Sequence, residues 1–224
     1  PVLLGLLLIA SAAGATGSVA PATTTGPAAP ADFPAAIYHQ LAAQGMSILR
    51  VDSPHSLVVI EVHRAGLFSS LGHDHVVASR DVAGYVSVST GVADLYVPLD
   101  RLVVDDPGLR TAAGMNTQPS QQDIEGTRRN MLTRTLDAEH FPFALIHITR
   151  NGDGRLKVAI TLHRITRSYA VAAQFETVPG GISVAGSMSF RQSDFGITPL
   201  AVLGGALKVR DRLDLRFQIL AQRN

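Results

Sequence analysis

Histidines are concentrated in one stretch of the chain, Asp52–Val77, which holds four of the eight in the sequence. Two of them, His73 and His75, are separated by a single residue, so they would share one face of a strand or chelate together from a loop. Neutral imidazole is a good ligand for zinc or copper. Two histidines do not close a tetrahedral site, however, and the spacing of the other candidates, such as His63, identifies no further ligand. Two interpretations of Gly72–His75 therefore stay open: a histidine-based metal-binding site, or polar residues that hydrogen-bond at the mouth of a barrel.

Signatures of catalysis do not occur in the sequence. It has no cysteine and no G-x-S-x-G elbow, and its serines, histidines and acids nowhere have the spacing of a triad. The group Asp52, His55 and Ser56 is interpreted as a hydrogen-bonded cluster at the start of a strand. We therefore predict that the protein is not an enzyme, with no catalytic residue and no cofactor. A net charge of +1 without a long basic run predicts no nucleic-acid partner.

The same stretch contains a strand that could support a site. Residues 56–63 alternate with a period of two, which places the first, third, fifth and seventh on an apolar face: Ser56, Val58, Ile60 and Val62. After Ala65–Gly66 the chain leaves this strand and carries three apolar residues, Leu67, Phe68 and Leu71. This pattern predicts the wall and the rim of an apolar pocket.

Alternation of apolar and polar residues recurs through the rest of the chain. It is clearest where turn signals such as Gly91, Asn151–Gly154 and Pro179–Gly181 separate the runs. In the last run, 207–219, only Asp211 interrupts the apolar side. Closely spaced strands of this kind predict an all-β fold, an antiparallel barrel or sandwich of about eight or nine strands.

Helices are expected at few positions. Ser120–Leu132 is the strongest candidate, because Ser120 and Asp123 form a capping-box pattern at its start. A short helix is predicted for Ala35–Ala43, which ends at a glycine. Val104–Thr117 is predicted to be a loop from its Asp-Asp-Pro-Gly turn signal.

Composition divides the chain into three parts. Residues 1–15 contain the apolar run Val2–Ala15 and end in Ala-Gly-Ala, which indicates a partial secretory signal peptide. Residues 16–34 are rich in Ala, Pro, Thr and Gly and are predicted to be a linker. Residues 35–224 are long enough for one domain with its own core. A periplasmic or secreted location follows, with an uncleaved N-terminal anchor as the alternative.

Four motifs resemble those of the YceI-like family of exported bacterial proteins, in the same order along the chain. They are the D-x-x-H-S segment Asp52–Ser56, the D-x-x-x-[YF]-P segment Asp137–Pro142, the hairpin Leu162–Arg167, and the D-[FW]-G-I run within Ser189–Ile197. The chain departs from the family pattern at several positions: Arg164 replaces the hairpin glycine, Thr127–Leu132 lacks an Asp and a His, and Gly72–His75 is richer in histidine.

This resemblance implies a lipocalin-like antiparallel β-barrel of about eight strands, with one helix in a long connection and a long apolar cavity. It also implies a long-chain isoprenoid or quinone-like lipid as partner, and it leaves a homodimer open. Seven large apolar residues are the candidate lining of the cavity: Phe68, Leu71, Phe143, Phe175, Phe190, Phe195 and Phe217. The alternatives are the metal-binding barrel built on His73 and His75, and a packed structural or stress-protective barrel without ligand.

Overall fold

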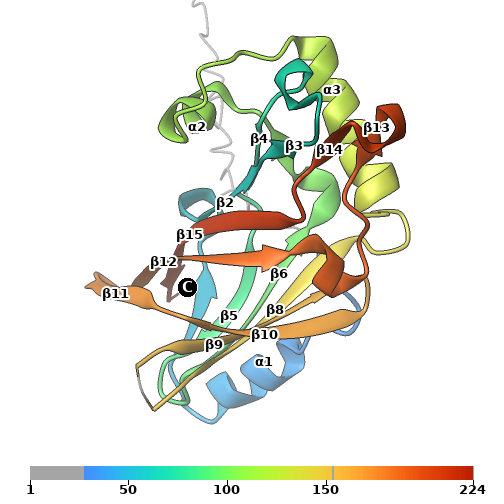
Figure 1. Cartoon of the computed structure of the whole chain (residues 1–224). Coiled ribbons are helices and arrows are strands. Elements are labelled where there is room, and N and C mark those ends of the chain that lie inside the picture. The colour runs from blue at the N-terminus through green and yellow to red at the C-terminus, as the bar shows by residue number, and fades with distance from the viewer. Residues whose placement is uncertain (1–27, 153, 224) are drawn as a thin grey trace, which may run out of the picture.

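Antiparallel β-strands dominate the computed structural model, which describes residues 28–152 and 154–223 (Figure 1). The predicted signal peptide, residues 1–15, and most of the predicted linker, residues 16–34, lie outside the described part. At the end of the linker Phe33 packs edge-on against Tyr96, with ring centroids 4.8 Å apart.

The main sheet has twelve strands, and every pairing in it is antiparallel. Its order is β10-β9-β8-β6-β5-β1-β15-β2-β4-β7, with β12 on β15 and β11 on β12. The strands are β1 (Ile48–Val51), β2 (Leu57–Val62), β4 (His75–Ser79), β5 (Ala83–Ser87), β6 (Val92–Pro98), β7 (Val103–Val104), β8 (Phe143–Arg150), β9 (Leu156–Leu162), β10 (Ile165–Val171), β11 (Ala173–Val178), β12 (Gly181–Arg191) and β15 (Arg212–Gln222).

A second, three-stranded sheet joins β13 (Ala201–Val202), β14 (Leu207–Val209) and β3 (Arg64–Ala65). The helices are α1 (Ala35–Ala43), α2 (Pro107–Ala112) and α3 (Gln121–Asn130), and a π-helical turn over Met131–Thr135 continues α3. No helix of the described ranges is long and apolar enough to cross a membrane.

Strand β15 organises the main sheet. One of its edges pairs with β12 over the whole length of the strand, and the other pairs first with β2 and then with β1. β1 and β2 therefore follow one another along the same edge, separated by the bend at Asp52–Ser56. The Ser56 hydroxyl donates to Asp52 O at 2.8 Å and accepts from the Leu220 amide at 3.0 Å. This is the hydrogen-bonded cluster expected from the sequence.

The prediction of a closed barrel is wrong, because the strands at the last seam do not pair with each other. β10 pairs with β9, β11 pairs with β12, and the described residues show no ladder between β10 and β12. At Ala172 the chain passes from β10, which pairs with β9, to β11, which pairs with β12. The Ala172 carbonyl oxygen lies close to Gly186 of β12, since a Cβ added to Gly186 would be 2.9 Å from it. Side chains fill the interval instead: the rings of Tyr169 and Phe190 lie 6.5 Å apart. The fold is mostly β and antiparallel as predicted, but its sheet is larger than expected and is not closed by hydrogen bonds.

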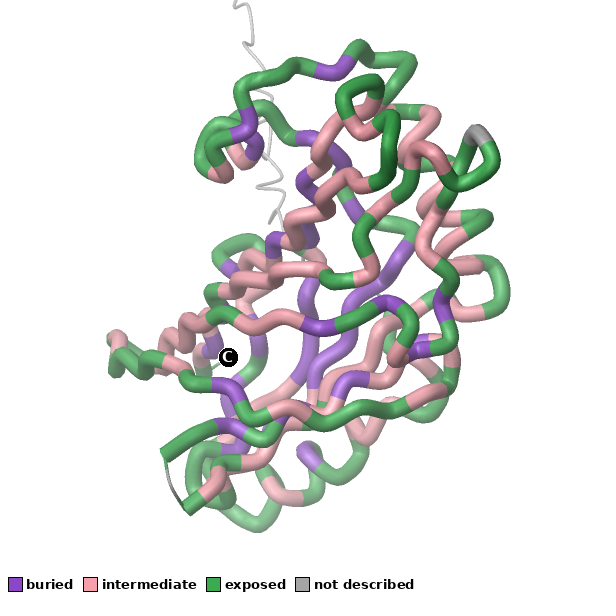
Figure 2. Tube along the Cα trace, in the orientation of Figure 1, coloured by how far each residue is buried: buried purple, intermediate pink, exposed green. Residues whose placement is uncertain are grey.

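Two apolar cores lie on opposite sides of the sheet near β2. The larger lies inside, where Figure 2 shows buried residues along the central strands. The smaller lies outside and contains Val59, Val76, Ala78 and Met115, against which Leu109 of α2 packs. The covering segment explains why β2 is apolar on both faces, since its outer side does not face water there.

Two of the helical predictions are confirmed and one loop prediction is wrong. α1 has the predicted bounds, and α3 begins with the predicted capping box between Ser120 and Asp123. α2 forms inside the predicted loop 104–117 because Asp106 caps it, accepting from the Leu109 amide at 3.0 Å, and Pro107 occupies its first turn. The long connection between β7 and β8 therefore holds two helices rather than one.

Gly84 is expected to tolerate no side chain. Its φ is +147°, and a Cβ there would lie 2.1 Å from Asp94 O and 2.8 Å from Leu95 Cα on β6. We expect Gly84→Ala to lower the free energy of unfolding by about 1–3 kcal/mol, as overpacking does. Gly126→Ala is the matched control, because Gly126 lies in α3 with nothing within 4 Å of an added Cβ. Urea unfolding should show that this control is neutral or more stable by up to about 1 kcal/mol; equal losses in both variants would contradict the contact.

A cavity lined by aliphatic residues

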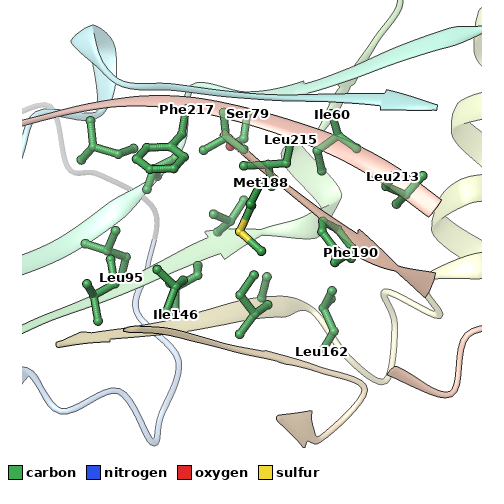
Figure 3. A pocket seen from close by; sticks show the side chains of 18 of the residues that line it. Ile60, Ser79, Leu95, Ile146, Leu162, Met188, Phe190, Leu213, Leu215 and Phe217 are labelled. Carbon is green, nitrogen blue, oxygen red and sulfur yellow. The ribbon is translucent and has the colours of Figure 1, made fainter. Parts of the chain in front are cut away.

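One cavity of about 570 Å³ lies inside the main sheet. Figure 3 shows its walls: Ile60, Met188 and Leu215 project from β2, β12 and β15, and face Leu95, Ile146 and Leu162 from β6, β8 and β9. Most lining side chains are aliphatic or aromatic. A volume of this size lies within the range of about 300–1,000 Å³ that is common for small-molecule sites.

The period of two in each strand directs these side chains inward. In β8 the lining residues are Ala144, Ile146, Ile148 and Arg150, all even-numbered. In β15 they are Leu213, Leu215, Phe217, Ile219 and Ala221, which continue the apolar face predicted from the sequence. Asp211, the exception on that face, lies just before β15, where it accepts from the Ser193 amide at 2.8 Å and from the Ser193 hydroxyl at 2.6 Å.

The candidate lining residues separate into two groups. Phe175, Phe190 and Phe217 line the cavity, and the guanidinium of Arg150 lies 5.4 Å from the Phe175 ring at one end of it. The other four, which do not line it, are Phe68, Leu71, Phe143 and Phe195.

Each of these four has a local reason for its position. Phe143 points to the outer face of β8, where its ring lies 6.0 Å from that of Tyr96. Phe195 is fully buried behind the wall, 5.8 Å from Phe190. Phe68 and Leu71 are 45% and 70% exposed, and their loop is held by a hydrogen bond from the Phe68 amide to Ala206 O, just before β14.

At the opposite end of β8 from Arg150, the cavity reaches α3 and the start of β4. Its polar lining residues there include His75, Thr127 and Asn130. His75 Nδ1 lies 2.6 Å from the Asp105 carboxylate, and Asp105 in turn pairs with Arg110 at 2.5 Å. Both Asp105 and Arg110 have fully buried side chains. This pair was not predicted, because the segment that carries it was interpreted as a loop.

Asp105 is held in a conformation unusual for a residue with a side chain. Its φ is +56°, and its backbone amide donates to Val76 O at 2.7 Å. Burial alone would raise the pKa of the Asp105 carboxyl, but hydrogen bonds from His75, the Val76 amide and Arg110 bring this pKa below its ordinary value. The carboxylate is therefore ionised at neutral pH.

The four histidines of the opening stretch do not come together. His55 contacts Asp52 at 3.0 Å, His63 lies 3.5 Å from Asp74, and His75 contacts Asp105. His73 Nδ1 is buried without a hydrogen-bond partner among the described residues. Across residues 28–152 and 154–223, no group of three or more His, Cys, Asp or Glu is arranged to hold a metal ion.

An antiparallel sheet wrapped around one apolar cavity defines a lipocalin-like β protein. Within this class, a family model described as the YceI-like domain matches residues 50–221, and the chain belongs to that family. No curated protein matches the sequence.

Two solved structures share the fold at low sequence identity. A polyisoprenoid-binding domain from Saccharophagus degradans, implicated in plant cell wall breakdown, is 9% identical with a TM-score of 0.57, over 80% of this chain and 99% of that one. BcnA from Burkholderia cenocepacia is 11% identical with a TM-score of 0.51, over 76% of this chain and 98% of that one.

Proposed function

We propose that the protein binds a long apolar lipid with an isoprenoid chain inside its cavity, without catalysing a reaction. The observation that carries this proposal is the cavity of about 570 Å³ with a mainly aliphatic lining. Branched aliphatic walls suit a flexible methyl-branched chain, which gains about 25 cal/mol for each Å² of apolar surface removed from water. The Saccharophagus degradans structure is described as polyisoprenoid-binding, which supports the same ligand class.

The proposal extends to quinone-like lipids, whose tails have the same chemistry. It also places the protein in the periplasm or outside the cell, on the basis of the apolar run Val2–Ala15 in the sequence. The homodimer stays a prediction.

A chain-length series tests the proposal. Delipidated protein is titrated by calorimetry with isoprenoid alcohols of increasing length. We expect the affinity to rise with each added isoprene unit, because each buried methylene contributes up to about 0.8 kcal/mol. The rise should end when the cavity of about 570 Å³ is full. Absence of binding, or an affinity independent of chain length, would overturn the proposal.

A further inference from the structure

We propose that His75 is a polar anchor for a hydroxyl head group, so that the cavity prefers an isoprenoid alcohol to the corresponding hydrocarbon or phosphate. This inference rests on the proposed function, because it assigns an orientation and a head group to the lipid in the same cavity. His75 is the one imidazole among the described residues that line this cavity.

The tautomer of His75 follows from its partner. The Asp105 carboxylate accepts from Arg110 at 2.5 Å and from the Val76 amide at 3.0 Å, and it lies 2.6 Å from His75 Nδ1. An ionised carboxylate only accepts hydrogen bonds, so Nδ1 must carry the proton. In the neutral ring the opposite nitrogen, Nε2, is then an acceptor. No described residue hydrogen-bonds to Nε2, and the side chain is 17% exposed.

The support behind His75 is rigid. Arg110 donates from Nε to Thr117 O at 3.0 Å, and its two terminal nitrogens contact Asp74 O at 2.7 Å and Thr117 O at 2.6 Å, besides Asp105. These contacts hold Arg110, Arg110 holds Asp105, and Asp105 fixes the ring of His75. An acceptor held in this way loses little entropy when a ligand hydroxyl binds to it.

The charges at this end of the cavity disfavour a phosphate. Arg110 is fully buried and its guanidinium is already engaged, and the nearest charge behind His75 is the negative carboxylate of Asp105. Among the described lining residues the single Arg or Lys is Arg150. Arg150 ends β8 at the other end of the cavity, about 20 Å from Ala144 at ~3.3 Å per residue.

The orientation of the lipid follows. The hydroxyl lies at His75, beside Thr127 and Asn130, and the tail runs along β8 toward Phe175. A hydrocarbon of the same length would leave Nε2 without a partner, and a phosphate would bring a charge to a site without a free cation. A buried polar group left without a hydrogen bond is costly, so the wild-type protein should bind the alcohol roughly tenfold more tightly than the hydrocarbon.

The experiment measures the affinities of three probes with one isoprenoid chain: the alcohol, the hydrocarbon and the monophosphate. In wild-type protein we expect the alcohol to bind most tightly. In His75→Phe the alcohol and the hydrocarbon should bind with about equal affinity, so the preference is lost while the hydrocarbon still binds. His55→Phe is the matched control, since His55 is 72% exposed and contacts Asp52; its preference should remain that of wild type.

A second measurement needs no substitution. In ¹⁵N NMR of the His75 ring, the resonance of unprotonated Nε2 should shift when the alcohol is added and stay in place with the hydrocarbon. Equal wild-type affinities for alcohol and hydrocarbon, tighter binding of the phosphate, or a protonated Nε2 would each overturn the anchor while leaving the cavity as a lipid site. If none of the probes binds, the proposed function fails instead.

Discussion

Arg110→Met is expected to lower the free energy of unfolding by about 3–5 kcal/mol, the range found when one member of a buried ion pair is removed. The reason is the carboxylate left behind. Asp105 is fully buried, so loss of the guanidinium leaves its charge with the His75 ring and the Val76 amide as partners. The variant also removes donors from Asp74 O and Thr117 O.

Urea unfolding of the two proteins measures this effect. Arg101→Met is the control, because Arg101 makes the same kind of pair with Asp81 at 3.2 Å but is half exposed; exposed pairs contribute about 0–1 kcal/mol. If Arg110→Met were as mild as the control, the buried pair would not be a main support of this end of the cavity.

The same carboxylate predicts how stability depends on pH. The pKa of Asp105 is lowered in the folded protein, against burial, by its hydrogen bonds to His75, Val76 and Arg110. A lowered folded pKa contributes stability above the unfolded value of about 3.9, and this contribution is lost as pH falls through the folded pKa. Wild-type stability should therefore decline below about pH 4, and the decline should be smaller in Arg110→Met, where the carboxylate pKa is less depressed.

The second large effect is expected from Met188→Trp, which should weaken binding of a long isoprenoid roughly a hundredfold. Met188 projects into the middle of the cavity, opposite Ile146 (Figure 3). An indole there occupies space that the lipid tail would fill. Loss of three or four buried methylenes, at about 0.8 kcal/mol each, accounts for the predicted change.

Ser187→Trp is the control, because Ser187 is exposed and adjacent to Met188 on β12, with its side chain on the opposite face. The chain has no natural tryptophan, so each variant carries a single reporter. We expect blue-shifted emission from Met188→Trp and red-shifted emission from Ser187→Trp, with lipid affinity lost only in the former. Similar affinities in both variants would show that the lipid does not occupy the cavity.

The faces of the strands could be predicted from the sequence, but the roles of those faces could not. A period of two placed Leu213, Leu215 and Phe217 on one side of β15, and that side lines the cavity. The same pattern does not distinguish a wall residue such as Phe190 from Phe195, which lies behind it. The prediction also favoured aromatic residues, whereas the lining is mainly aliphatic.

The polar end of the cavity could not be predicted because its parts meet only in three dimensions. His75 and Asp105 are 30 residues apart, and no local pattern joins them. The sequence Asp105–Gly108 is compatible with a turn, as predicted, and also with the start of a helix, which Asp106 and Pro107 favour. The helix that forms there carries Arg110.

The change of strand partner at Ala172 leaves one seam of the cavity wall, between β10 and β12, without a backbone ladder among the described residues. Parting the wall at any ladder breaks backbone hydrogen bonds, whereas parting β10 from β12 breaks only side-chain packing, including the contact between Tyr169 and Phe190. Phe190 is also a wall residue of the cavity. This seam runs alongside the cavity, so entry of a chain-like guest through the side of the wall would break no strand pairing among the described residues.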